Sequence, residues 1–237
     1  MKTRTSHITN SMTLSPLRRV LLLVPLMLAC FTLSPAARAV DPPSDGGFDD
    51  DNTAMSLPFT EEGSDDPGLV TIFSNLASKY PKGIYWCCSG YNVTGPNSSF
   101  AEQWMAAAFT PNADHTVTKI QVAAGWSEGT NGIVISLNED NNGIPGTALK
   151  TWNVSRLPFF GTCCTLLEVS SRIGIPASGG QQYWVMLSTN DRELNTVDAW
   201  NMSDADQVDE ATLASFTSNE WNVFQAVPGV AFAVKGN

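Results

Sequence analysis

Few residues of this chain have the types and spacing that catalysis requires. Of its two histidines, only His115 lies outside an N-terminal segment described below, which excludes a metal site with several histidine ligands. A Ser-His-Asp triad would depend on His115. That residue begins the run HTVTKIQV, and its position is typical of an ordinary polar residue at the end of a surface strand. The sequence contains no GxSxG motif, HExxH motif or glycine-rich phosphate loop.

Carboxylates are the remaining groups that could support hydrolysis, because a glycoside hydrolase needs only two of them facing each other. Five side chains are candidates for such a pair: Glu102, Glu128, Glu139, Glu168 and Asp198. The sequence does not show whether any two of them meet in space. We therefore predict a non-catalytic protein and keep a polysaccharide hydrolase as the alternative.

Tryptophans beside turn residues are candidates for binding a ligand. Trp126 (in AAGWSEG) and Trp221 (in SNEWNV) have such positions, and an exposed indole offers a surface on which a sugar ring can stack. Asn219 and Asn222 flank Trp221 and could form hydrogen bonds with sugar hydroxyls. We predict that a ligand site uses these residues; the alternative for each tryptophan is a place in the core.

One loop resembles a calcium-binding loop in part. Asn138, Asp140 and Asn142 occupy positions one, three and five of that pattern. Position twelve is Leu149, where a bidentate Glu is required. We favour a hairpin turn, because Asn and Gly tolerate positive φ, and keep calcium binding as the alternative.

Four of the five cysteines form two adjacent pairs, Cys87-Cys88 and Cys163-Cys164. An even number of cysteines in an exported chain predicts disulfides. Four cysteines allow three connectivities, and a bond within either pair would close a strained ring. We predict that one pair is joined to the other; a four-thiolate zinc site is the alternative.

The N-terminus has the pattern of a secretory signal peptide over residues 1–39. Met1 to Arg19 is basic, Val20 to Leu33 is apolar, and Ala37-Arg38-Ala39 is a small-x-small cleavage site. The predicted mature chain is thus exported, to the extracellular space, the periplasm or the cell surface. Cys30 could instead become the lipid-bearing first residue of a lipoprotein, which would anchor the protein to a membrane.

The charge of the predicted mature chain restricts its partners. Five of the 13 basic residues and none of the 23 acidic residues lie in residues 1–39, which leaves a net charge of −15. Nucleic acids and anionic membrane surfaces require clustered Lys and Arg, so both are excluded as partners. No further apolar run is long enough to span a membrane.

The rest of the chain divides into two parts. Val40 to Gly68 contains nine acidic residues and no Lys or Arg, and we predict a disordered leader there. Residues 69–237 contain short runs that alternate apolar and polar residues, separated by Gly, Pro and Asn. Ala101–Phe109 has some helical character, but we expect a strand.

These runs predict an all-β domain of about ten strands in a two-sheet antiparallel sandwich of jelly-roll type. The expected strands are Val70–Ser74, Tyr91–Val93, Ala101–Phe109, His115–Ala124, Ile133–Asn138, Leu149–Val154, Thr165–Ser170, Tyr183–Ser188, Asp198–Met202, Trp221–Phe224 and Val230–Val234.

Several segments of the predicted domain resemble the choice-of-anchor R domain, a family of bacterial secreted and surface proteins. The resemblance rests on YWCCSGYNVTGPNS (85–98), FTPNADHTVTKIQV (109–122), DNNGIPGT (140–147), LPFFGTCCTL (157–166), QYWV (182–185) and DAWN (198–201). It implies an exported β-sandwich whose molecular function is unassigned, and it supplies no catalytic residues.

Three functions are consistent with these features. The first is a secreted or cell-surface module without catalytic activity that binds a glycan or a component of the extracellular matrix. The second is a structural surface protein without a small ligand. The third is the hydrolase considered above. No cofactor is expected unless the loop at Asp140 binds calcium.

Overall fold

The computed structural model describes residues 55–58, 68–76, 84–163, 165–189, 194–203 and 211–237. The predicted signal peptide, Cys30, Cys164 and most of the predicted leader lie outside these residues. The described residues form strands, turns and irregular segments, with no helix among them. The expected all-β class is confirmed.

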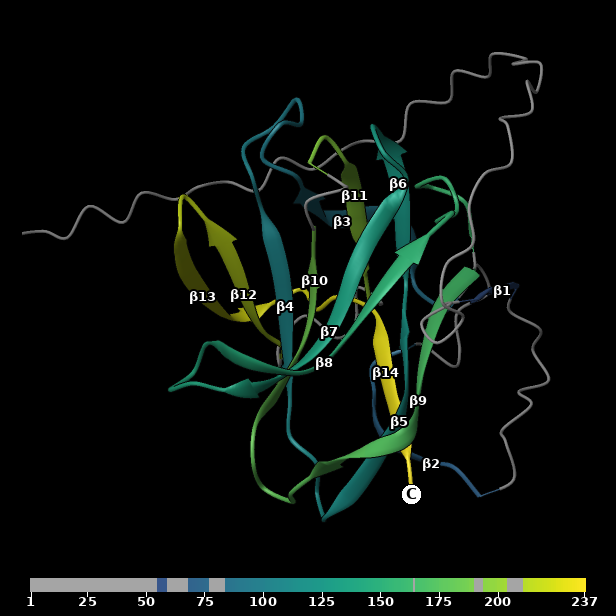
Figure 1. The fold of residues 1–237 in the computed structure, drawn as a ribbon, viewed down its shortest axis with the longest axis vertical. Helices are drawn as coiled ribbons and strands as arrows, with labels where there is room; N and C mark the ends of the chain where they lie inside the picture. Colours follow the sequence, from purple (N-terminus) through teal and green to yellow (C-terminus); the bar gives the residue numbers. More distant parts are fainter. Residues whose placement is uncertain (1–54, 59–67, 77–83, 164, 190–193, 204–210) are drawn as a thin grey trace, which may run out of the picture.

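The strands form three antiparallel sheets, of which two are large (Figure 1). The five-stranded sheet consists, in spatial order, of β1 (Met55–Pro58), β9 (Thr165–Ala177), β5 (His115–Val122), β14 (Phe232–Gly236) and β2 (Val70–Ser74). The six-stranded sheet consists of β13 (Glu220–Val227), β12 (Ala211–Thr217), β4 (Trp104–Phe109), β10 (Tyr183–Ser188), β7 (Gly132–Asp140) and β8 (Pro145–Ser155). The three-stranded sheet consists of β3 (Trp86–Thr94), β11 (Val197–Met202) and β6 (Ala124–Glu128).

The main core contains the inward-facing side chains of both large sheets, which is the arrangement of a β-sandwich. The five-stranded sheet contributes Ile120, Val122, Leu167, Phe232 and Val234, among others, and the six-stranded sheet contributes Met105, Phe109, Ile135, Leu137 and Leu187. Full burial of each such side chain stabilises the fold by about 1.5–3 kcal/mol relative to exposure. The alternation of apolar and polar residues therefore places one face of each strand in this core.

The Ala-rich run at β4 is a strand, as expected. Its residues Met105, Ala107 and Phe109 face the main core, whereas Ala106 and Ala108 pack on the opposite face beside Trp184. A small side chain is needed there, because the indole of Trp184 is fully buried against this face. Tertiary packing thus outweighs the helical preference of alanine.

Three expectations about strands are corrected. The predicted disordered leader contains β1, which pairs antiparallel with β9, so the expectation is wrong at Met55–Pro58. The expected single strand His115–Ala124 is two strands that belong to different sheets and meet at Ala123, whose amide donates to the Ala231 carbonyl (3.1 Å). We did not expect β12, and the described sheets contain more strands than ten.

Among the described residues there is no helix with the length and apolar character that a membrane crossing requires.

Candidate ligand-binding surface at the loop end

Trp126 and Phe159 form an aromatic pair where β6 meets the chain that leads into β9. The Trp126 amide donates to the Pro158 carbonyl, and the Phe160 amide donates to the Trp126 carbonyl, each over 2.8 Å. The two rings are 6.0 Å apart and nearly perpendicular, at 74°. Trp126 is half-buried and packs against the main core, whereas Phe159 is 61% exposed. The exposed ring of the pair is therefore that of Phe159.

The sequence around Phe159 explains why this ring faces solvent. Leu157 and Phe160 on either side are both buried, which holds the segment with Phe159 outward. A β-carbon at Gly125 would lie 2.9 Å from the Phe160 α-carbon, so only glycine allows this segment to approach β6. The side chain of Asn131 donates to the Leu157 carbonyl (3.0 Å) and accepts from its amide (2.6 Å), which holds the segment from the other side.

Polar side chains surround the loop that follows Trp126. The Trp126 indole donates to the Gly129 carbonyl (3.2 Å), and the hydroxyl of Ser99 donates to the Glu128 carboxylate. The Thr130 amide and hydroxyl both donate to Asn195 Oδ1, over 3.2 and 2.7 Å. These bonds join loops that are distant in sequence into one surface, which we call the loop end. β6 runs to this end at the top of Figure 1.

The loop end has the chemistry of a sugar-binding surface. An exposed ring can stack on the apolar face of a pyranose, and hydroxyl, amide and carboxylate groups can bond its hydroxyls. Phe159 was not among the predicted site residues. The run Pro158-Phe159-Phe160 held a signal for it, because successive side chains of an extended segment point to opposite sides.

Trp221, the second predicted platform, lies in a different environment. Its ring is 5.4 Å from that of Phe216, which in turn stacks on Trp104 at 4.5 Å and 21°. Trp221 is half-buried and also packs against the cluster formed by Ala106, Trp184 and Ala214. Much of this indole therefore stabilises the six-stranded sheet.

The structure does not bring the predicted site residues together. Trp126 is on the three-stranded sheet, and Trp221 is on the outermost strand of the six-stranded sheet. Figure 1 shows β6 and β13 on opposite sides of the molecule. Asn219 is exposed in the turn before β13, and Asn222 is exposed, with its side chain donating to the Thr217 hydroxyl (3.4 Å).

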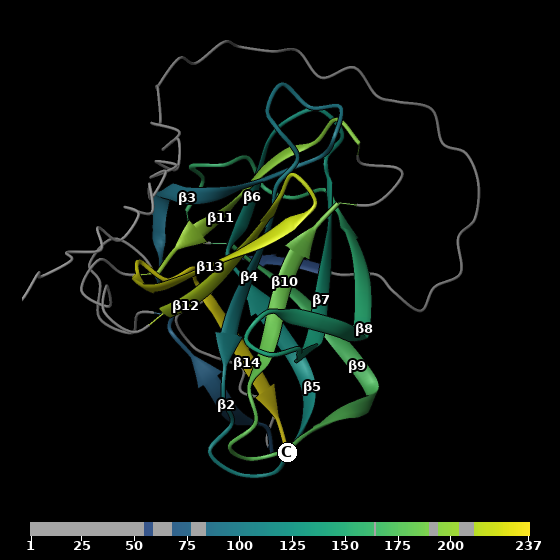
Figure 2. The same ribbon diagram turned by 90° about the vertical axis from the view of Figure 1, so that its left-hand side faces the viewer.

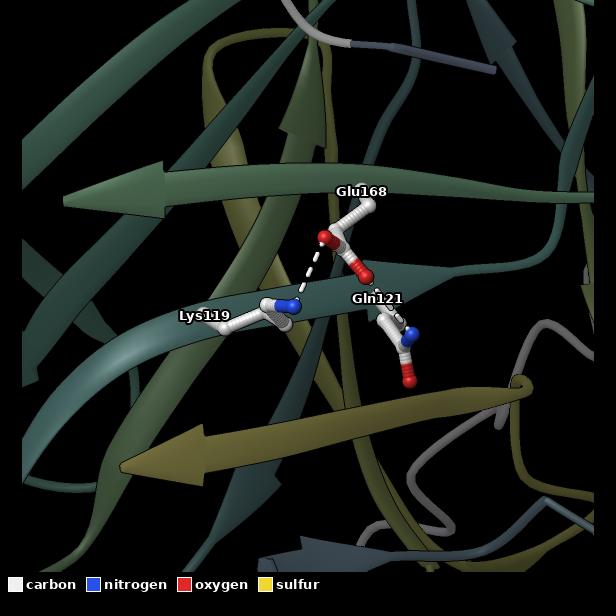
Figure 3. Close-up of polar contacts among 3 residues, drawn as sticks. All are labelled: Lys119, Gln121 and Glu168. Atoms are coloured by element: carbon white, nitrogen blue, oxygen red, sulfur yellow. Dashed lines mark hydrogen bonds and ion pairs between the residues drawn. The ribbon is translucent and has the colours of Figure 1, made fainter. Parts of the chain in front are cut away.

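The candidate carboxylates lie in different parts of the fold. Glu168 on β9 forms an ion pair with Lys119 (2.9 Å) and accepts a hydrogen bond from Gln121 (2.8 Å), as Figure 3 shows. Glu139 on β7 is exposed, and Glu102 is half-buried before β4. Glu168 thus belongs to a polar network along the surface of the five-stranded sheet.

Glu128 and Asp198 are on adjacent strands, β6 and β11, but their surroundings differ. Asp198 is fully buried and accepts a hydrogen bond from the Thr196 hydroxyl (3.3 Å). Glu128 is exposed at the end of its strand and is bonded to Ser99. A hydrolase would need both carboxylates to reach one substrate bond.

The residues of the calcium-like loop are hydrogen-bonded within the β7–β8 hairpin. Asn138 is buried, accepts from the Ser136 hydroxyl (2.7 Å) and donates to the Gly146 carbonyl (2.9 Å). Asn142 has a φ of 56°, in the left-handed region that turns require. Within the part of the chain that the structure describes, no three His, Cys, Asp or Glu side chains are grouped to hold a metal ion.

Asp140 stabilises this hairpin through three hydrogen bonds. Its Oδ1 accepts from the Gln182 side chain and the Trp184 indole, both at 2.8 Å, and its Oδ2 accepts from the Gly143 amide at 3.0 Å. Burial alone would raise the pKa of the Asp140 carboxyl. The bonds from Trp184, Gly143 and Gln182 outweigh burial and lower that pKa below its ordinary value.

The thiols of Cys87 and Cys88 are free in the structure, with their sulfurs 3.9 Å apart. The predicted disulfides from these two residues are therefore not formed in it. Cys88 is exposed, whereas Cys87 is half-buried, because adjacent residues of a strand point to opposite faces. Burial, and then the neighbouring Cys88, raise the pKa of the Cys87 thiol.

The surroundings of Cys87 nevertheless bring it close to the second cysteine pair. Cys87 packs against the small cluster that contains Tyr85 and Leu166. The Tyr85 hydroxyl lies 3.4 Å from the Thr162 carbonyl and 3.1 Å from the Thr165 carbonyl. Burial is the main cause that raises the pKa of Tyr85 to about 12. A cross-link between the two pairs stays a prediction.

Comparison with known proteins finds no family model that matches the chain and no curated protein that matches it.

Proposed function

We propose that this protein is an exported, non-catalytic β-sandwich module of jelly-roll type that binds a glycan at the loop end. The observation that carries the proposal is the exposed ring of Phe159, held perpendicular to Trp126 beside hydroxyl, amide and carboxylate groups. An isolated apolar ring on a soluble protein gains nothing from water, whereas a sugar covers it without removing its own hydroxyls from polar partners.

The division of work between the two rings supports a pre-formed site. Trp126 is packed against the core and donates its indole N–H to Gly129, so it cannot move freely. Phe159 rests against it and has two side-chain torsions to order. A rigid aromatic platform loses little conformational entropy on binding, which favours affinity from a small contact area.

Charge narrows the class of glycan. The chain has 23 acidic and 13 basic residues, and Glu128 lies on the loop-end surface. A polyanionic glycan would be repelled by this field. The proposed ligand is therefore a neutral polysaccharide, presented outside the cell or in the cell wall.

Export is the premise of this proposal, and it rests on the signal-peptide pattern of residues 1–39. The resemblance to the choice-of-anchor R domain supports the same location. A structural surface protein without a ligand, and a hydrolase that uses Glu128 with Asp198, are the two rival functions.

The experiment is a glycan array with the purified exported protein, followed by calorimetry of the best ligand with two variants. Phe159→Ala should weaken binding by about 1–3 kcal/mol, which is roughly 5- to 150-fold, because it removes the stacking surface. The matched control is Ile173→Ala, which removes a side chain that is 96% exposed on β9 and should leave affinity unchanged. No glycan bound, equal affinity of Phe159→Ala and wild type, or hydrolysis of the bound glycan would each contradict the proposal.

A further inference from the structure

The hairpin formed by β12 and β13 is nearly free of charge in a protein that is otherwise acidic. Residues 211–227 contain one charged side chain, Glu220, whereas the chain as a whole has 36. The hairpin is instead rich in apolar and aromatic residues, among them Phe216, Trp221, Val223 and Phe224. Depletion of charge and enrichment of aromatic residues distinguish the centre of a protein interface from the rest of the surface.

β13 is also an open edge of the six-stranded sheet. It pairs with β12 on one side, and no described strand pairs with its other side. Figures 1 and 2 both show it as the outermost strand of this sheet. Every residue from Asn222 to Ala226 is exposed, and the large side chains of Val223 and Phe224 are 40% and 41% exposed. The strand thus offers unpaired backbone groups together with apolar side chains on both of its faces.

Other edge strands of this protein carry features that block pairing. β8, the opposite edge of the same sheet, begins with Pro145, contains Lys150 and has two register shifts against β7. β2, an edge of the five-stranded sheet, has five residues. Proline, lysine, irregular register and short length are the usual means by which proteins prevent association at an edge. β13 has one bulge, at Ala226 (φ 54°), so its register is regular from Glu220 to Gln225.

We propose that β13 pairs antiparallel with β13 of a second copy of this chain, so that the two six-stranded sheets become one continuous sheet. Two identical strands can pair in this way about a two-fold axis. With the axis at Val223, the two Val223 side chains face each other and each Trp221 lies opposite a Gln225. Both Glu220 side chains then lie toward the ends of the paired segment.

Charge selects a second copy as the occupant. Two copies with a net charge of −10 each repel one another over most of their surfaces. The β12–β13 hairpin is a place where they can meet without opposing carboxylates. The surface is separate from the loop end, so this inference does not depend on the proposed glycan binding.

The test is sedimentation of the purified protein over a wide range of concentration. The wild type should show a monomer–dimer equilibrium. Val223→Glu should weaken the dimer at least 10-fold, because it places like charges directly opposite each other at the axis. The matched control is Val70→Glu, on the edge strand β2 and 46% exposed, which should leave the dimer intact.

A second measurement applies even if Val223→Glu fails to fold. In hydrogen exchange of the wild type, the β13 amides that do not pair with β12 should be slower at high concentration than at low concentration. A wild type that stays monomeric at its solubility limit would overturn the proposal. So would a dimer that Val70→Glu dissociates, or one whose β13 amides exchange at the monomer rate; the latter would assign the interface to another surface.

Discussion

The two hairpins at the edges of the six-stranded sheet are built differently. In the β7–β8 hairpin, the edge strand is tied to the rest of the fold by side chains: Trp152 is buried in the main core, and its indole donates to the Ser170 carbonyl on β9 (2.8 Å). Asp140 holds the turn through three hydrogen bonds. In the β12–β13 hairpin, the edge strand is exposed almost throughout, and its half-buried Trp221 contacts Phe216 on the neighbouring strand.

This difference separates stability from association. The β8 edge contributes to the core and is protected by Pro145 and Lys150, so we expect it to stabilise the monomer. The β13 edge contributes less to the core and leaves its backbone open. We expect substitutions in the first hairpin to change the free energy of unfolding and substitutions in the second to change contacts between molecules.

The largest expected effect compares the two edge tryptophans. Trp152→Ala should lower the free energy of unfolding by about 3–5 kcal/mol, because it leaves a cavity between the two large sheets. Trp221→Ala should lower it by about 1–2 kcal/mol, because the half-buried ring loses one aromatic contact and part of its packing. Urea unfolding of the monomer, followed by circular dichroism, measures both. Equal losses would show that the two edges support the fold to the same extent.

An intermediate effect is expected at the turn of the first hairpin. Asp140→Asn should lower stability by about 1–2 kcal/mol at neutral pH, because three bonds to a charged acceptor become weaker. The lowered pKa of Asp140 means that the folded protein favours the ionised carboxylate. Its contribution is therefore complete above the ordinary pKa of about 4 and is lost as the pH falls through the lower pKa of the folded state.

The difference between wild type and Asp140→Asn should thus shrink as the medium is acidified below the ordinary pKa of an aspartate. Urea unfolding at a series of pH values measures this difference. Glu139→Gln, at the exposed neighbouring position, is the control and should match wild type throughout. A difference that grows on acidification would contradict the role given to the carboxylate.

The smallest expected effect is at the turn of the second hairpin. Ser218 and Asn219 have φ values of 53° and 64°, which is the left-handed pair that a two-residue hairpin turn requires. Asn219→Gly should therefore change stability by no more than about 0.5 kcal/mol. Asn219→Val should cost about 1 kcal/mol or more, because a β-branched residue is strained at positive φ. Thermal unfolding of the two variants side by side distinguishes these outcomes.

Much of the fold could be predicted from local pattern. The period of two in Ile133–Asn138 and Tyr183–Ser188 identified β7 and β10, and the Asn-Asn-Gly sequence identified the turn after β7. β1 was missed because its four residues stand in a strongly acidic stretch, and its strand conformation depends on pairing with β9. β12 (ATLASFT) was missed because it mixes small, polar and apolar residues, and its neighbours β4 and β13 provide its hydrogen bonds.

The candidate site could be predicted only in part. The position of Trp126 beside a turn was visible in the sequence, and so was the chemistry of an aromatic ring near polar groups. The exposure of Phe159 depends on the burial of Leu157 and Phe160 and on the close approach that Gly125 allows, which are contacts between distant segments. Trp221 has equally polar neighbours in the sequence, yet its ring packs against a cluster of buried residues.

By itself, the sequence determined the all-β class, most strands and turns, the acidic charge and the lack of catalytic motifs, because these depend on residue type and on spacing within a few residues. The tertiary structure alone decided which strands pair, which sheet each half of residues 115–128 joins, which aromatic ring is exposed and which edge strand stays open. Pairing brings together segments that are far apart in the chain, and a period of two is compatible with many partners. The burial of a given side chain follows from that choice of partners, which local pattern does not contain.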